Sequence, residues 1–338
     1  MSNRWPGGLI RKTPVTPAGP FQCGAAIGVW TLAEAAFWTK QGLWPIAGNV
    51  PPETFAVFAL GSTAAGNVAT RDKYTYSGDV VSSGGAATVA SSNGSAAGNS
   101  TVGIFALGSA TTRNKYTYSG DVVSAGGAAT ASSGRGSAAG NSTVGIFALG
   151  QTSGGVVTTR DKYTYSGCVV SAGGAATAAS YYSSAAGNST VGIFALGCNG
   201  SFTALTTRNK YTYSGDVVSA GGAATAASAY GSAAGNSTVG IFALGANACG
   251  SPLTTRNKYT YSGCVVAAGG AATAASTQGS AAGNSTIGIF ALGSASFSRS
   301  TTRNKYTYSG CVVSAGGAAT TASSDGSAAS NGTSGVNM

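Results

Sequence analysis

The sequence predicts an all-β fold, a six-bladed β-propeller with four-stranded blades. Two phrases, Phe-Ala-Leu-Gly and Thr-Arg-(Asn/Asp)-Lys-Tyr-Thr-Tyr, occur six times each in the same order. The lysines of the second phrase mark the period of 42–48 residues: Lys73, Lys115, Lys162, Lys210, Lys258 and Lys305. A fixed period in this range is typical of repeat architectures. Four short antiparallel strands joined by tight turns fill such a length, which is the size of a propeller blade.

Each unit has four parts, and the fifth unit illustrates them. Residues 231–236 (Gly-Ser-Ala-Ala-Gly-Asn) are small, as the innermost strand near a crowded axis requires. Residues 239–244 (Val-Gly-Ile-Phe-Ala-Leu) are apolar on both faces, which indicates a strand covered on both sides. Residues 256–261 alternate, so Arg256 and Tyr259 point to opposite faces. A Ser-Gly turn then leads into a fourth strand that opens at Cys264.

The two ends of the repeat array complement each other. The first unit, residues 54–88, has no small-residue strand before it, and residues 326–331 form an extra one after the sixth unit. We expect this C-terminal strand to complete the first blade, because closing the ring removes an open sheet edge. The array then spans residues 54–331, and residues 332–338 form a tail.

Residues 1–53 differ from the repeats and are expected to form a docking arm. Seven of the 8 prolines lie there, and the pattern Thr31-Leu-Ala-Glu34 is a capping box that predicts a short helix over residues 32–41. The arm also contains all 4 tryptophans, which we expect to contact a partner: Trp5, Trp30, Trp38 and Trp44. A helix this short is marginal alone, so it should pack against something.

Charge and hydropathy limit the kinds of partner and the location that we expect for the protein. The formal net charge is +10, and most of the basic residues are the arginine and lysine of the repeated phrase. We expect these side chains to solvate the outer parts of the fold. The arginines could instead bind anionic sugars or phosphates, or bond carbonyls of the neighbouring blade. The N-terminus lacks a signal-peptide core, and no apolar run is long enough to span a membrane, so we expect no membrane insertion.

Catalysis and metal binding are not expected. The chain has no histidine, and its 6 cysteines include no Cys-x-x-Cys pair, so zinc and other cofactors are not predicted. Cys168, Cys264 and Cys311 occupy a repeat position that holds aspartate in the other three units, so free thiols are expected. Most aspartates stand where other units have Asn or Cys, and no carboxylate pair is singled out for acid–base work. We therefore expect a non-enzymatic protein.

The units differ from one another in two places, both predicted to lie on one face of the disc. One is the segment after Leu-Gly, and the other precedes Ser-Ala-Ala. Aromatic and basic side chains there are typical of recognition surfaces. We therefore expect a ligand or partner site formed by Asn93, Arg135, Tyr181, Tyr182, Phe202, Tyr230, Gln278, Phe297, Arg299 and Asp325.

Two resemblances extend this interpretation. The order of a small strand, Ile-Phe-Ala-Leu-Gly and a tyrosine-bearing strand resembles kelch-type repeats, although only one Gly follows Phe-Ala-Leu and the fourth-strand Trp is absent. The N-terminal stretches 3–14, 28–33 and 41–45 look like the opening of structural proteins of aquatic tailed bacteriophages. This second resemblance implies a virion protein that is made in the host cytoplasm and assembled in multiple copies.

In that interpretation residues 1–53 bind other virion proteins, and the variable face binds a host-surface glycan or protein, or a neighbouring protein. No nucleic acid partner is expected. The alternative is a bacterial lectin-like adhesin or scaffold with no virion attached.

Overall fold

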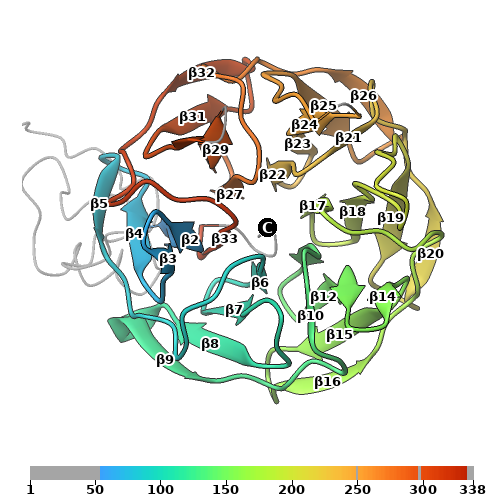
Figure 1. The fold of residues 1–338 in the computed structure, drawn as a ribbon, viewed down its shortest axis with the longest axis horizontal. Coiled ribbons are helices and arrows are strands. Elements are labelled where there is room, and N and C mark those ends of the chain that lie inside the picture. The colour runs from blue at the N-terminus through green and yellow to red at the C-terminus, as the bar shows by residue number, and fades with distance from the viewer. Residues whose placement is uncertain (1–53, 249, 296–297, 333–338) are drawn as a thin grey trace, which may run out of the picture. The chain divides into compact units, whose positions relative to one another are not determined.

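The computed structural model describes residues 54–248, 250–295 and 298–332 (Figure 1). The expected arm, its helix over residues 32–41, the four tryptophans, Phe297 and nearly all of the expected tail lie outside these residues. The described part is all-β. Its only helical element is a single 3₁₀ turn, Ser119–Asp121.

Six four-stranded antiparallel sheets make up the described chain, as the repeat pattern predicts. Sheet 1 contains β33 (Ser327–Ser330), β1 (Phe55–Ala59), β4 (Arg71–Thr75) and β5 (Val80–Ser83), and sheet 2 contains β6 (Ser95–Gly98), β7 (Val102–Ala106), β8 (Arg113–Thr117) and β9 (Val122–Ala125). Sheet 3 contains β11 (Ala138–Gly140), β12 (Val144–Ala148), β15 (Arg160–Thr164) and β16 (Val169–Ala172), and sheet 4 contains β17 (Ser184–Gly187), β18 (Val191–Ala195), β19 (Arg208–Thr212) and β20 (Val217–Ala220). Sheet 5 contains β22 (Ser232–Gly235), β23 (Val239–Ala243), β25 (Arg256–Thr260) and β26 (Val265–Ala268), and sheet 6 contains β27 (Ser280–Gly283), β28 (Ile287–Ala291), β31 (Arg303–Thr307) and β32 (Val312–Ala315).

The C-terminal strand pairs with the first strand of the array. β33 lies antiparallel to β1, with Ala56 opposite Ser330 and Ala59 opposite Ser327. The expectation that residues 326–331 complete the first sheet is therefore confirmed. Figure 1 shows the sheets following one another around a common centre, with the red C-terminal strand beside the blue first sheet. The first strands of successive sheets contact one another in turn, and β33 contacts both β27 and β6. The arrangement is consistent with a β-propeller.

The core lies between neighbouring sheets, and the same contacts recur at each junction. Between sheets 4 and 5, Val191 and Ile193 pack against Phe242, Tyr259 and Tyr261. This is why the second strand must be apolar on both faces: each face meets a different sheet. Gly240 is required there, because a Cβ would lie 2.9 Å from the Cβ of Ala186 on the neighbouring sheet.

The arginine of each repeat is buried, so the expectation that these side chains solvate the surface is wrong for the arginines. All six are 1% exposed. The Arg208 guanidinium lies 4.7 Å from the centre of the Phe242 ring on the next sheet, and its Nη2 donates to Asn257 Oδ1 at 3.0 Å. Burial lowers the pKa of Arg208 to about 10, which leaves it charged at neutral pH. These six cations fasten neighbouring sheets together and do not face solvent.

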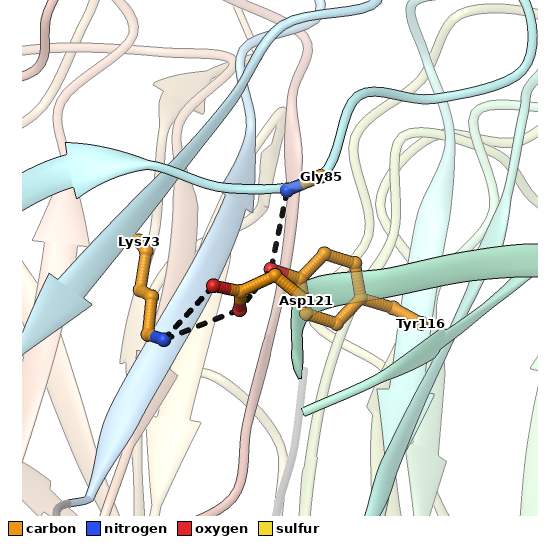
Figure 2. A network of polar contacts seen from close by, with 4 residues as sticks. All are labelled: Lys73, Gly85, Tyr116 and Asp121. Carbon is orange, nitrogen blue, oxygen red and sulfur yellow. Dashed lines mark hydrogen bonds and ion pairs between the residues drawn. The ribbon is translucent and has the colours of Figure 1, made fainter. Parts of the chain in front are cut away.

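The repeat lysines are partly exposed, and three of them, Lys73, Lys162 and Lys305, form ion pairs with an aspartate of the next sheet. Lys73 of sheet 1 contacts the Asp121 carboxylate of sheet 2 at 3.1 and 3.2 Å, and Tyr116 donates to the same carboxylate at 2.7 Å (Figure 2). The Gly85 amide, on the segment between the two sheets, donates to the Tyr116 hydroxyl (Figure 2). At the equivalent position three sheets carry cysteine, and among the described residues these thiols are free, as expected: Cys168, Cys264 and Cys311.

Candidate ligand-binding site

The two variable segments of each repeat lie side by side, as the sequence predicts. Short strand pairs and bridges join them: β10 (Ser133–Gly134) pairs with β13 (Gln151–Thr152), and β21 (Ser228–Ala229) pairs with β24 (Ala246–Asn247). Comparable bridges join Tyr181 to Cys198 and Thr277 to Ser294. In units 1, 3 and 6 the segment after Leu-Gly contains a short hairpin of its own. β3 (Gly66–Asn67) pairs with β2 (Ser62–Thr63), β14 (Gly155–Val156) pairs with β13, and β30 (Ser298–Arg299) pairs with β29 (Ser294–Ala295).

One residue from each sheet adopts the left-handed backbone conformation at the end of the second variable segment. These residues, which we call the variable ring, are Asn93 (φ 57°), Arg135 (φ 61°), Tyr182 (φ 53°), Tyr230 (φ 60°), Gln278 (φ 56°) and Asp325 (φ 56°). All six belong to the site predicted from the sequence.

The variable ring is closed by its own backbone hydrogen bonds. Each amide donates to the carbonyl of the ring residue before it: Asn93 to Asp325 (2.8 Å), Arg135 to Asn93 (2.9 Å), Tyr182 to Arg135 (2.7 Å), Tyr230 to Tyr182 (3.1 Å), Gln278 to Tyr230 (2.9 Å) and Asp325 to Gln278 (2.9 Å). The amides of these residues are therefore occupied, and what distinguishes one position from the next is the side chain alone.

The variable ring places residues other than glycine at positions where φ is positive. A positive φ is uncommon for residues other than glycine, and bulky side chains there cost of order 1 kcal/mol or more. The chain has 54 glycines, yet none of the six ring positions is one. In five sheets the very next residue is glycine, as at Gly136 after Arg135. A second left-handed position recurs in every unit, but it alternates only between Asp and Cys: Asp79, Asp121, Cys168, Asp216, Cys264 and Cys311. The variable ring differs from it in the diversity of its side chains, which include Arg, Tyr, Gln, Asn and Asp.

One side of the variable ring is aromatic. The ring centroids of Tyr182 and Tyr230 lie 3.9 Å apart. The Arg135 guanidinium carbon lies 4.9 Å from the Tyr182 centroid, and Arg135 also donates to the Gln151 side chain. Burial raises the pKa of both tyrosines, so both are neutral hydroxyl groups at physiological pH. The two half-buried rings are tilted by 32° to each other, and the Tyr182 ring also contacts Arg135 and Tyr181.

The other side of the ring is polar. Burial raises the pKa of the Asp325 carboxyl, although hydrogen bonds from Ser324 and Gln278 and the charges of Arg299 and Arg135 oppose that rise. Asn93 completes this side and donates to the Ser92 hydroxyl. The variable ring therefore carries aromatic side chains in two consecutive units and polar side chains in Gln278, Asp325 and Asn93.

A small cavity lies at the centre, directly beside the variable ring. Its volume is about 60 Å³, and it is lined by the residues that follow each ring position and by the first residues of the inner strands. Those inner residues are one serine per sheet: Ser95, Ser137, Ser184, Ser232, Ser280 and Ser327. In the sequence, this repeated serine indicates only a small residue that allows close packing. Its recurrence beside the most variable position was the signal that could have identified it.

The remaining predicted site residues are placed differently. Tyr181 is only 2% exposed and packs with Cys198, Ala204 and Ala229, so the expectation that it faces a partner is wrong. It lies beneath the surface because Tyr182, its neighbour, takes the outward position. Phe202 is 71% exposed and meets Tyr181 edge-on at 5.7 Å. Arg299 is exposed and donates to the Ser62 hydroxyl, and Phe297 lies outside the described residues.

Comparison of the chain with protein-family models and with curated protein sequences finds no match. Within the described residues, no helix is long and apolar enough to cross a membrane, and no group of three or more His, Cys, Asp or Glu side chains could hold a metal ion.

Proposed function

We propose that the chain is a closed six-bladed β-propeller with kelch-like strand order that recognises a partner through the variable ring. The observation that carries this proposal is the contrast between scaffold and ring. Six nearly identical sheets are each followed around the ring by one variable residue with a left-handed backbone, and these six residues have side chains of five kinds. Drift in unconstrained loops would not maintain a closed ring of hydrogen bonds, nor place arginine and two tyrosines at strained positions.

A non-enzymatic role is part of this proposal. Five of the six carboxylates in the described residues serve the scaffold. Asp72 and Asp161 accept hydrogen bonds from buried arginines, and Asp79, Asp121 and Asp216 bind lysines of the preceding sheet. The sixth, Asp325, lies in the variable ring without a second carboxylate beside it. General acid–base catalysis needs a side chain placed to transfer a proton to a substrate, and the five scaffold aspartates are already occupied by arginine or lysine.

We further propose that the protein is a component of a tailed bacteriophage virion, present in multiple copies, in which residues 1–53 bind other virion proteins and the variable ring meets the host surface. The resemblance of the N-terminal stretches to phage structural proteins supports the virion assignment, and the half-buried variable ring at the loop ends of a repeated scaffold supports the attachment role.

Mass spectrometry of phage particles purified from infected cells tests the virion assignment. We expect peptides of this chain in the particles at the level of a structural protein. Their absence from particles, together with their presence on the surface of bacteria, would contradict it and would favour the bacterial adhesin. A truncated chain beginning at Thr54 should fail to enter the particles, because the docking arm is missing.

A further inference from the structure

We propose that the central cavity and the variable ring together bind a neutral saccharide, with a hydroxyl or hydroxymethyl group in the cavity and a sugar face on the tyrosine stack. This inference deepens the proposed attachment role and rests on it. It names the chemistry of the ligand and the residues that select it.

The first argument is the set of unused hydroxyl groups in the cavity. Within the described residues, the side chains of five of the six lining serines make no hydrogen bond to another protein group, whereas Ser137 accepts one from Ser183. Three of the five, Ser184, Ser280 and Ser327, are more than nine-tenths buried. The oxygens of these hydroxyl groups are not enclosed by protein, so from the cavity they can donate to and accept from a ligand or water.

The second argument is the charge of the lining. No residue that lines the cavity is charged, and hydroxyl groups both donate and accept. The amides of the variable ring are consumed by the ring itself, so the cavity mouth lacks the converging N–H groups that bind phosphate or sulfate. A neutral hydroxyl group uses both the donors and the acceptors of this lining, whereas an anionic group would use only the donors.

The third argument is size. A cavity of about 60 Å³ accommodates a few water-sized groups and not a sugar ring. The ring of the sugar must therefore lie across the mouth, against the variable ring. The variable-ring residues directly precede the lining residues in each unit. They supply the stacked Tyr182 and Tyr230, against which a sugar C–H face can pack, and the hydrogen-bonding groups of Gln278, Asp325 and Asn93.

The experiment uses the full chain on an array of immobilised neutral oligosaccharides, of hexoses and N-acetylhexosamines, beside uronate and sialate oligosaccharides. Four variants accompany the wild type. Tyr230→Ala removes half of the aromatic stack, Ser232→Ala removes one cavity hydroxyl, and Ser232→Leu fills the cavity. Ser219→Leu makes the same change on the exposed outer strand β20 and is the matched control.

We expect the wild type and Ser219→Leu to bind neutral oligosaccharides equally. Tyr230→Ala and Ser232→Leu should each weaken binding at least about tenfold, the equivalent of ~1.4 kcal/mol. Ser232→Ala should weaken it less, and because it leaves the packing intact it separates a lost hydroxyl from a disturbed fold. Circular dichroism melts confirm that each variant is folded.

Three results would overturn the inference: binding of uronate or sialate oligosaccharides only, equal binding by wild type and Ser232→Leu, or no binding to any saccharide. Adsorption to host cells then decides whether the attachment role survives. If periodate treatment of the cells leaves adsorption intact while protease treatment abolishes it, the partner is a protein, and only the saccharide inference fails. If untreated cells are not bound either, the attachment role fails with it.

Discussion

Asp72 offers a direct test of how the ends of the array are joined. It lies on sheet 1 and accepts a hydrogen bond from Arg303 of sheet 6 at 2.7 Å, with both side chains at most 1% exposed. Thr320 donates to its other oxygen at 2.6 Å. Four of the other junctions use asparagine at this position, where the amide donates to the threonine, as Asn209 does to Thr177 at 2.8 Å.

Replacing Asp72 by alanine leaves a buried guanidinium without its acceptor, which typically destabilises a protein by ~3–5 kcal/mol. The Arg303 Nη1 keeps only its bond to the Ala318 carbonyl. Asp72→Asn keeps a neutral acceptor, and the threonine hydroxyl can rotate to accept instead of donate. Its effect should be about 1 kcal/mol, the difference between a charged and a neutral hydrogen bond.

Equilibrium urea unfolding at neutral pH measures both values. We expect Asp72→Ala to lower the free energy of unfolding by several kcal/mol and Asp72→Asn to lower it by far less. Asn209→Asp, the reverse exchange at the junction of sheets 3 and 4, is the matched control and should be tolerated, because Arg160 is the donor there. Equal destabilisation by Asp72→Ala and Asp72→Asn would refute the reasoning, and so would a neutral Asp72→Ala.

Three further outcomes follow from the same structure. Deleting residues 326–338 removes β33, and we expect a single, cooperative loss of thermal stability across the whole array in calorimetry; an unchanged melt would show that the array does not depend on closure. Tyr181→Ala should destabilise the fold by ~3–4 kcal/mol in urea, as for other buried aromatic residues, whereas Tyr182→Ala should destabilise it less and mainly weaken adsorption to host cells; the opposite ranking would contradict the assigned burial. Asp325→Asn should raise the melting temperature at pH 7, because burial raises the folded-state pKa of this carboxyl and its ionised form therefore opposes folding. That advantage should shrink as the pH falls through the folded pKa toward the unfolded value of 3.8, and a pH-independent difference would contradict it.

The sequence was informative where repetition and periodicity specify structure. The alternation within residues 256–261 assigns Arg256 and Tyr259 to opposite faces, and the extra small-residue segment after residue 325 predicts the strand that joins β1. Six copies of one unit also show which positions vary, and this pattern identified all six residues of the variable ring.

The sequence did not show how deeply a side chain is buried or which residues have a left-handed backbone. Alternation gives the face of Arg256 but not that a neighbouring sheet covers it, because the junction is formed by residues about 48 positions away. Tyr181 and Tyr182 are adjacent and chemically identical, and the sequence does not show that Tyr181 is buried while Tyr182 has a left-handed backbone in the ring. Left-handed positions are usually recognised by glycine, and here tyrosine and arginine occupy them.

The most direct test of the account is to replace all six residues of the variable ring by glycine and to measure adsorption of the full chain to the host cells. Glycine fits the left-handed conformation without strain, so the closed ring of backbone hydrogen bonds should persist. The matched control replaces six exposed outer-strand valines by threonine: Val80, Val122, Val169, Val217, Val265 and Val312. We predict that the glycine variant keeps a cooperative melt and loses adsorption while the control retains both. Adsorption of the folded glycine variant at the wild-type level would contradict the claim that the variable ring is the recognition site.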